Sequence, residues 1–424
     1  MANTILVFLD CEGLSTPLRL GTLHAYDAGR SEQFAFEYAP DVVKDDLLRG
    51  SHLDPCLQAY GGMQYPPEER KTWGLFADAS PDRWGRMLMK RRHERERKLD
   101  PSLPRSLFES DYLLGVHDQY RVGALRLRLH EDGPFLDCRD QLGAPPLVKL
   151  RELEAAVRAL ENDEYDNAPI APKENEWLNM LIAPGGSLGG ARPKASVITP
   201  EGQLMIAKFP SVQDECDVGG WEMLVHVLAK ACGIRVADSR INKYASKRYT
   251  FLTTRFDRSA TGKRFHFASA MAITNHVDGD DESTGVSYLE IAQFLIQHGA
   301  QSQADLKELW TRILFNVLVS NTDDHLRNHG FLFVPGQGWR LSPAYDMNPV
   351  PDARGLKLNI DEHDNALDLD LVRSVAPQFR VSQTAAKEIE SHCKQIVRRW
   401  VDIADKIGIP RSEMAVMETA FKLG

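Results

Sequence analysis

The chain has 424 residues, of which 43% are hydrophobic and 26% are charged, and its formal net charge is -9. This is the composition of a globular protein with enough length for two or three domains. The acidic balance argues against non-specific nucleic-acid binding by the chain alone. Its six cysteines are scattered without CxxC spacing, which is typical of reduced thiols in a cytosolic protein. No apolar stretch approaches the roughly 18 residues that span a bilayer, so we expect a cytoplasmic protein with no membrane segment.

Short apolar alternations open the chain and predict a small antiparallel sheet. Ser80 followed by Pro81 predicts the start of a charged helix, with Ser80 as its N-cap. Within this helix, the segment Arg86–Lys98 has seven Lys or Arg against two Glu. We favour a solvated helical face there, with a docking surface for a partner protein or DNA phosphates as the alternative. Strand-like segments return at 112–116 and 123–129.

Proline and glycine residues between 134 and 146 predict a linker. An amphipathic helix follows, then a glycine-rich turn, a strand pair, a helix at about 218–232 and more strands. Beyond about residue 287 the pattern is mostly helical. A strand-rich part before a helix-rich part predicts a bilobal α+β protein. We expect an N-terminal β-rich subdomain, a lobe with the glycine-rich loop and a mostly helical C-terminal lobe, at 1–133, 147–258 and 259–424.

A dense polar loop, SNTDDHLRNHG, separates two apolar segments. Asp323 and Asn328 have the D-x-x-x-x-N spacing of a protein-kinase catalytic loop. In such a loop the carboxylate orients the attacking hydroxyl and the amide oxygen holds a metal ion. With His325 the pattern becomes D-x-H-x-x-N, which is also that of aminoglycoside and choline phosphotransferases. A polar loop capped by Asp and Asn is the structural alternative.

Two short apolar runs after this loop predict a hairpin that ends in Asp346. The order Asp, Asn, hairpin, Asp is that of a kinase, in which the last aspartate is a second metal ligand. Because Mg²⁺ keeps several of its waters, Asn328 and Asp346 would suffice to hold it. A lone aspartate after a strand is otherwise a turn residue.

The stretch GGSLGGARPKASV, at 185–197, is a glycine-rich turn before a strand. Glycine lets backbone N–H groups approach phosphate oxygens, although the Walker A pattern is absent and a plain hairpin is the alternative. Lys208 lies on the next apolar strand, where it would bind phosphates or extend from a sheet edge. Glu222, on the following helix, would orient it. For Arg255 and Asp257 we favour a structural ion pair.

Together these motifs resemble the HipA family of serine/threonine kinases, the toxins of bacterial type II toxin–antitoxin modules. The resemblance covers essentially the whole chain. It implies a protein-kinase-like (HipA-like) core, ATP and Mg²⁺ as cofactors, and phosphorylation of a protein such as an aminoacyl-tRNA synthetase, which favours dormancy and persistence. It rests on six motifs in order, namely LFADASPDRWGR, SLGGARPK, IAKFP, TRFDR, NTDDHLRNHGFL and LSPAYDM.

The resemblance also assigns roles to single residues. Asp323 is implied as the catalytic base, with Asn328 and Asp346 as metal ligands. Ser187 is implied as an autophosphorylation site, where a phosphate of about -1.5 to -2 charges would compete with ATP and switch the enzyme off. The residues implied in ATP binding are Ser187, Gly189, Gly190, Ala191, Lys194, Lys208, Thr254, Phe256 and His325.

The family further implies an antitoxin partner of the HipB type, a small helix-turn-helix dimer that would make most contacts with operator DNA. Two alternatives stay open. One is a small-molecule phosphotransferase of the aminoglycoside or choline kinase type, against which the N-terminal module ending in PDRWGR argues. The other is a non-catalytic regulator that binds an antitoxin and operator DNA. The joint presence of Asp323, Asn328, Asp346 and Lys208 argues against this second alternative.

Overall fold

The protein is described by a computed structural model that covers residues 2–29, 31–44, 51–139, 143–162, 181 and 192–422. Its chain forms two compact units. The first unit comprises Met1–Val212, Thr254–Ala268 and Phe333–Gly336, and the second comprises Gln213–Thr253, Ser269–Leu332 and Gln337–Gly424. The division into three parts at 1–133, 147–258 and 259–424 stays a prediction.

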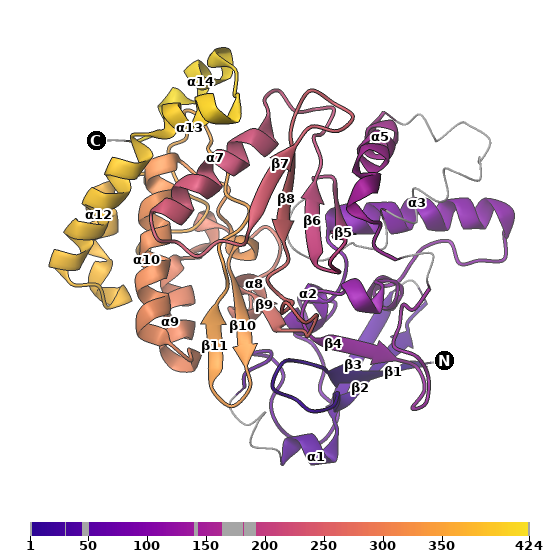
Figure 1. Ribbon diagram of the computed structural model, residues 1–424. Coiled ribbons are helices and arrows are strands. Elements are labelled where there is room, and N and C mark those ends of the chain that lie inside the picture. The colour runs from indigo at the N-terminus through magenta and orange to yellow at the C-terminus, as the bar shows by residue number, and fades with distance from the viewer. Residues whose placement is uncertain are drawn as a thin grey trace. The chain divides into compact units, whose positions relative to one another are not determined.

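The first unit contains a four-stranded antiparallel sheet in the order β3-β2-β1-β4 (Figure 1). The strands are β1 (Ala2–Leu9), β2 (Leu18–Asp27), β3 (Glu32–Tyr38) and β4 (Leu125–Arg128). Ile5, Leu23 and Phe36 lie opposite one another across three strands and are fully buried. Burial alternates clearly in β2, where Leu23 lies between the half-buried Thr22 and His24, whereas residues 5–9 of β1 and 34–36 of β3 are buried throughout. The paired strands confirm the predicted N-terminal sheet.

Each helix of this unit buries part of its residues. They are α1 (Pro40–Val43), α2 (Gly74–Asp78), α3 (Arg83–Leu99), α4 (Glu109–Leu114) and α5 (Leu150–Glu161), with short 3-10 turns η1 (Asp118–Tyr120) and η3 (Leu147–Lys149). The amphipathic helix α5 confirms its prediction. The predicted strand at 112–116 is wrong, because most of it belongs to α4. Asp111 accepts a hydrogen bond from the Phe108 backbone N–H at 2.8 Å and favours the helix.

Helix α3 begins two residues later than the sequence suggests. Its N-cap is Asp82, whose carboxylate accepts a hydrogen bond from Gly85 N at 2.8 Å. Ser80, the predicted N-cap, instead donates from its hydroxyl to the Phe76 carbonyl at the end of α2. The Asp82 carboxylate is a good acceptor for the first-turn N–H groups, and its negative charge is favoured at a helix N-terminus.

The first unit also holds an antiparallel strand pair, β5 (Lys194–Ile198) and β6 (Leu204–Lys208), in which Lys194 lies opposite Lys208. Strand β9 (His266–Ser269) ends the 254–268 segment. The described residues include no helix that is both long enough and apolar enough to cross a bilayer.

The second unit is mostly helical and has α10 (Ser302–Val319) as its buried central helix. Helices α9 (Tyr288–His298) and α12 (Gln383–Val397) pack on α10 and lie beside it in orange and yellow (Figure 1). The strands that lie wholly or mostly in this unit are β7 (Ser239–Asn242), β8 (Thr250–Thr254), β10 (Gly330–Val334) and β11 (Gly338–Leu341). The other helices are α7 (Val218–Ala231), α8 (Ala270–Ile273), α11 (Leu369–Ser374), α13 (Trp400–Ile407) and α14 (Arg411–Met417), with 3-10 turns at Glu282–Thr284, Leu326–Asn328, Ala376–Phe379 and Glu418–Ala420.

The predicted hairpin after the polar loop is confirmed by β10 and β11, which are neighbours in one sheet. Phe331 on β10 and Trp339 on β11 are fully buried and contact Phe294 of α9 with ring centroids 4.7 and 6.0 Å away. The polar loop therefore joins two well-packed elements, the central helix α10 and the hairpin.

Candidate active site

The polar loop begins where α10 ends. Ser320 caps the helix in the left-handed conformation, with φ of 48° and no exposed surface. Its carbonyl accepts a hydrogen bond from Val350 N at 3.0 Å, and Asn321 N donates to the Asn316 carbonyl at 2.9 Å. These contacts turn the chain sharply out of a buried helix and fix the start of the loop.

Asp324 anchors the loop in the core. One of its carboxylate oxygens accepts hydrogen bonds from Tyr288 Oη at 2.6 Å and Asn316 Nδ2 at 2.7 Å, and His329 Nε2 lies 2.8 Å from the same oxygen. Burial alone would raise the pKa of Asp324, but His329 and the hydrogen bonds outweigh it and hold the pKa below its ordinary value. Asp324 is thus an ionised, fully paired structural carboxylate.

Asp323, the adjacent residue, is exposed. Neighbouring protein atoms still remove part of its hydration, which raises its pKa; the carboxylate of Asp346 adds to this effect, while His325 and Lys357 oppose it. A raised carboxylate pKa beside a second carboxylate is a common feature of catalytic acids and bases. The structure therefore brings Asp323, His325 and Asp346 close together, as the sequence predicts.

Asn328 offers an oxygen ligand for a cation. Its Nδ2 donates to the Asp323 carbonyl at 2.9 Å, whereas its Oδ1 is buried and has no hydrogen-bond partner in the described part of the chain. An unpaired buried amide oxygen, in a loop that also carries Asp323, is the kind of ligand that a hard cation such as Mg²⁺ takes. The described residues contain no cluster of three or more His, Cys, Asp or Glu side chains that could hold a metal ion, so a cation here would depend on the Asn328 amide and on water for its other ligands.

Asp346 has an unusual backbone for a residue with a side chain, because its φ is 59°. Such left-handed residues are sparse outside glycine and gather at functional sites. The preceding residue, Tyr345, donates from its hydroxyl to the Arg327 carbonyl at 2.6 Å, and Arg327 in turn lies 3.2 Å from Asp278. The Asp346 segment and the Asn328 segment are therefore tied to each other directly.

The residues predicted to bind ATP are only partly described. Ser187, Gly189, Gly190 and Ala191 lie outside the described residues. Lys208 and Phe256 are half-buried in the first unit, and Thr254 is half-buried at the end of β8. Since Lys208 belongs to the first unit and Glu222 to the second, their pairing stays a prediction, as do the ATP contacts.

Lys194 has a partner that the sequence did not reveal. Its Nζ lies 2.8 Å from Asp82 Oδ2, and the two side chains are 6% and 1% exposed. The indole Nε1 of Trp84 donates to the Lys194 carbonyl at 3.0 Å. The PDRWG motif thus holds the first residue of β5 by both its side chain and its backbone.

The predicted ion pair of Arg255 and Asp257 is confirmed. Arg255 donates from Nε and Nη2 to the two Asp257 oxygens at 2.9 and 2.6 Å, and both residues are buried. Arg258 adds a contact at 2.8 Å, and Gly123 N donates to Asp257 at 2.9 Å. Because a Cβ on Gly123 would lie 3.0 Å from Phe267 N and its φ is +71°, only glycine fits this approach without strain.

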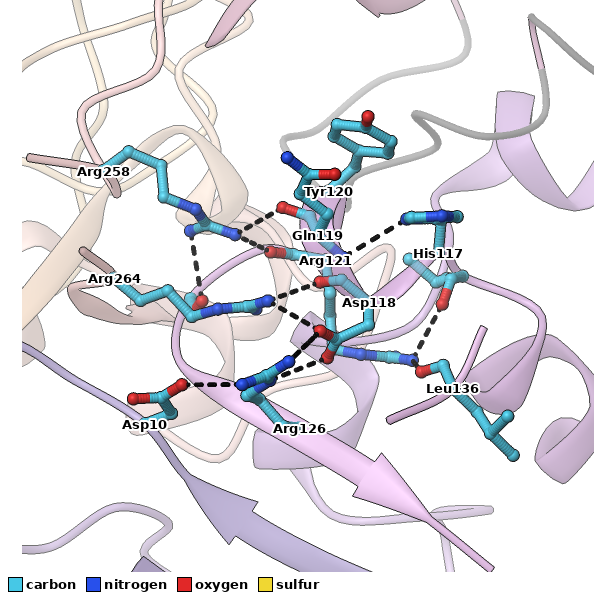
Figure 2. A network of polar contacts seen from close by, with 12 residues as sticks. Asp10, His117, Asp118, Gln119, Tyr120, Arg121, Arg126, Leu136, Arg258 and Arg264 are labelled. Carbon is cyan, nitrogen blue, oxygen red and sulfur yellow. Dashed lines mark hydrogen bonds and ion pairs between the residues drawn. The ribbon is translucent and has the colours of Figure 1, made fainter. Parts of the chain in front are cut away.

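Arg258 also belongs to a wider network of polar contacts centred on Asp118 (Figure 2). Arg126 and Arg264 both contact Asp118, at 2.6 and 3.1 Å, and Arg126 also reaches Asp10 at 2.9 Å. Four of these residues line a pocket of about 790 Å³ in the first unit. The charged walls of the pocket pair with each other, so the network fastens the 258–264 segment to the 118–126 segment.

Two arginines of the basic segment Arg86–Lys98 make contacts with other parts of the protein. Arg86 forms a bidentate pair with Glu109, and Arg91 donates to the Leu160 carbonyl at 2.8 Å. Arg86 and Arg91 therefore have structural partners within the protein, and the choice between a solvated face and a docking surface stays open for the rest of the segment.

Sequence reasoning missed the residues that support the loop from outside it. Tyr288, Asn316 and His329 hold Asp324, and Lys357 acts on Asp323. One signal was available, since Asn316 is a polar residue inside the long apolar run of α10 and a buried amide requires a polar partner.

Comparisons with known proteins identify the family and the fold of the chain. Residues 186–402, more than half of the chain, match the model of the HipA-like C-terminal domain. The chain therefore belongs to the HipA-like C-terminal domain family. The solved HipA of Shewanella oneidensis MR-1, in a complex with HipB and its operator DNA, superposes with a TM-score of 0.63 at 16% identity over 98% of this chain and 95% of that one. This similarity confirms the predicted α+β fold of the HipA type.

Two curated relatives are named as proposed kinases. The Haemophilus influenzae protein is 28% identical over 216 residues, which is 46% of this chain and 62% of that protein. The Sinorhizobium fredii protein, Y4mE, is 27% identical over 183 residues, which is 38% of this chain and 41% of that protein. The match thus spans less than two thirds of the length of either relative.

Proposed function

We propose that this chain is an ATP- and Mg²⁺-dependent protein serine/threonine kinase that acts as the toxin of a HipA/HipB-type module. The observation that carries the proposal has two parts. Asp323 is exposed, and the Asp346 carboxylate acts on it electrostatically; in the same loop, the buried Oδ1 of Asn328 has no hydrogen-bond partner among the described residues. Membership of the HipA-like family supports it. The protein substrate is a translation component such as an aminoacyl-tRNA synthetase, which places the activity in the cytoplasm.

In this mechanism Asp323 orients the hydroxyl of the substrate side chain and accepts its proton. As the proton leaves, the hydroxyl oxygen forms its bond to the γ-phosphorus and the bond to the β-γ bridging oxygen breaks, which releases ADP. Asn328 and Asp346 would hold Mg²⁺, which would neutralise negative charge on the phosphates. Asp324 keeps Asp323 in place without taking part in proton transfer.

Lys208 binds ATP phosphates in this proposal, and His325, Thr254 and Phe256 contribute to the nucleotide site. Autophosphorylation of Ser187 switches the enzyme off, since a phosphate there competes with ATP for the same loop. A HipB-like helix-turn-helix protein is the antitoxin, as in the solved Shewanella complex, and it makes most of the operator contacts.

The test is incubation of the purified protein with Mg²⁺ and γ-labelled ATP, followed by mapping of phosphorylated residues. We expect label on Ser187 and, after addition of a cell lysate, on one or few target proteins. Choline and an aminoglycoside are offered in parallel reactions. Label on these small molecules in place of protein would favour a small-molecule phosphotransferase. No transfer to any acceptor despite ATP binding would favour a non-catalytic regulator.

A further inference from the structure

Two lysines face each other on neighbouring strands of the first unit. Lys194 of β5 and Lys208 of β6 are partners in the antiparallel register. Phe209 N donates to the Pro193 carbonyl at 2.9 Å, so the lysines, one position along, form a non-hydrogen-bonded pair. Such pairs have Cα atoms about 4.5 Å apart and side chains on the same face. Like charges directly opposite each other destabilise a sheet.

A buried carboxylate compensates one of the two charges. Asp82 Oδ2 lies 2.8 Å from Lys194 Nζ, while its Oδ1 accepts from Gly85 N at 2.8 Å and is thereby fixed at the start of α3. Trp84, the second residue of α3, donates from its indole N–H to the Lys194 carbonyl. If Lys194 moved away, the buried carboxylate of Asp82 would lose the cation that neutralises it, which is energetically costly.

We propose that Lys194 is a positioning residue and not a phosphate ligand, and that Asp82 and Trp84 hold it so that Lys208 alone serves the ATP phosphates. The inference rests on the proposed function and replaces the expectation that Lys194 binds ATP. Neutralised by Asp82, Lys194 no longer repels the ammonium of Lys208, and its fixed backbone sets the position of β6 at Lys208. The N-terminal motif PDRWG thus acts on the nucleotide site through a strand end.

The test is a double-mutant cycle with Asp82→Asn, Lys208→Ala and the combined variant. It is followed in kcat/KM for ATP and, independently, in the dissociation constant of ATP with Mg²⁺ by calorimetry. A positioning loss predicts that Asp82→Asn lowers kcat/KM by roughly 10- to 100-fold. In the Lys208→Ala background the same change has less than about a twofold effect, because both act on one interaction. Losses that multiply in the combined variant overturn the proposal.

A second pair of variants guards against a simple folding defect. Asp82→Asn leaves a buried unpaired lysine, whereas Asp82→Asn with Lys194→Met removes both charges. We expect the double variant, Asp82→Asn with Lys194→Met, to recover most of the kcat/KM that Asp82→Asn loses, since removing both partners costs far less than removing one. If Lys194 were a phosphate ligand, the double variant would be less active than Asp82→Asn alone, and the inference would be wrong. Glu109→Gln is the control. It weakens the ion pair between Glu109 and Arg86 of α3, and we expect it to change neither kcat/KM nor the dissociation constant of ATP.

The failure of the proposed function gives a different pattern. Lys208→Ala with unchanged ATP binding and unchanged transfer would remove Lys208 from the nucleotide site and overturn both statements. Wild-type protein that binds no ATP would do the same. A wild-type enzyme that is active and sensitive to Lys208→Ala, with multiplying losses, overturns only the positioning role of Lys194.

Discussion

Asp323 and Asp324 are adjacent in the chain and have opposite environments. Asp324 is buried with three polar groups around one oxygen, and its pKa is lowered. Asp323 is exposed beside Asp346, and its pKa is raised. Only one of the two carboxylates is available to a substrate, and the other holds the loop in which the first is presented.

Asp324→Asn is expected to act on stability. Loss of the charge weakens its contacts with Tyr288, Asn316 and His329, so the free energy of unfolding should fall by about 1–3 kcal/mol. Urea denaturation followed by tryptophan fluorescence measures this change. Because the pKa of Asp324 is lowered on folding, its contribution is present above the unfolded value, about 3.9, and is lost as the pH falls through the folded pKa. A variant as stable as the wild type at neutral pH would contradict the anchoring role.

Asn328→Ala is expected to weaken metal binding. The change removes the unpartnered Oδ1, and even supporting partners of a metal site cost about 10- to 100-fold in affinity when lost. Mn²⁺ binding measured by electron paramagnetic resonance gives the affinity without any reference to activity. Asn328→Asp, which keeps an oxygen at this position, is the matched control and should retain binding. Equal affinities for wild type and Asn328→Ala would exclude this residue as a ligand.

Asp257→Asn is expected to unfold the first unit more readily. The carboxylate is buried between Arg255 and Arg258, and its loss leaves two guanidinium groups without compensation. Breaking a buried pair in this way costs about 3–5 kcal/mol of unfolding free energy. Asp10→Asn is the control, because Asp10 is 32% exposed and such pairs contribute about 1 kcal/mol or less. Similar losses for both variants would contradict the structural importance of the Arg255–Asp257 pair.

His276 is expected to make the second unit less stable as the pH rises. A hydrogen bond with Glu290 is the main cause that raises the pKa of His276; burial opposes it, and Asp280 adds to it. The protonated form is favoured by folding, so its stabilisation is complete below the unfolded pKa of about 6.5 and is lost as the pH rises through the folded pKa.

Thermal unfolding between pH 6 and pH 8 measures this effect. The difference in Tm between wild type and His276→Gln should be largest at the acid end and shrink toward the alkaline end. His392→Gln, which replaces another histidine of the second unit, is the matched control for the loss of an imidazole. A Tm difference for His276→Gln that does not vary with pH would refute the titration of this residue.

Much of the fold follows from local sequence patterns. The short apolar runs of β1 to β3 and the helical periodicity of α5, α7, α9 and α10 were readable, because burial selects apolar residues at the positions it covers. The segment 112–116 was not, since a short apolar run fits a strand and a buried helix equally well. The start of α3 depended on which of two capping residues competes better, Ser80 or Asp82.

The candidate site could be predicted where its parts lie close in sequence, since the spacing of Asp323 and Asn328 and the hairpin before Asp346 are local patterns. Of these the structure confirms the hairpin, and the roles of the three residues stay predictions. The supporting contacts join residues far apart in the chain, such as Tyr288 with Asp324 and Asp82 with Lys194. No local pattern specifies which distant donor meets a given carboxylate, so these partners became visible only with the fold.

The central claim is that Asp323 is the base of a phosphotransfer site. Its most direct test compares phosphate transfer by wild type, Asp323→Asn and Asp324→Asn under single-turnover conditions, with urea denaturation alongside. Asp323→Asn should lose about 10²- to 10⁴-fold in rate with an unchanged unfolding midpoint. Full transfer by Asp323→Asn, with loss of transfer in a stably folded Asp324→Asn, would contradict the account.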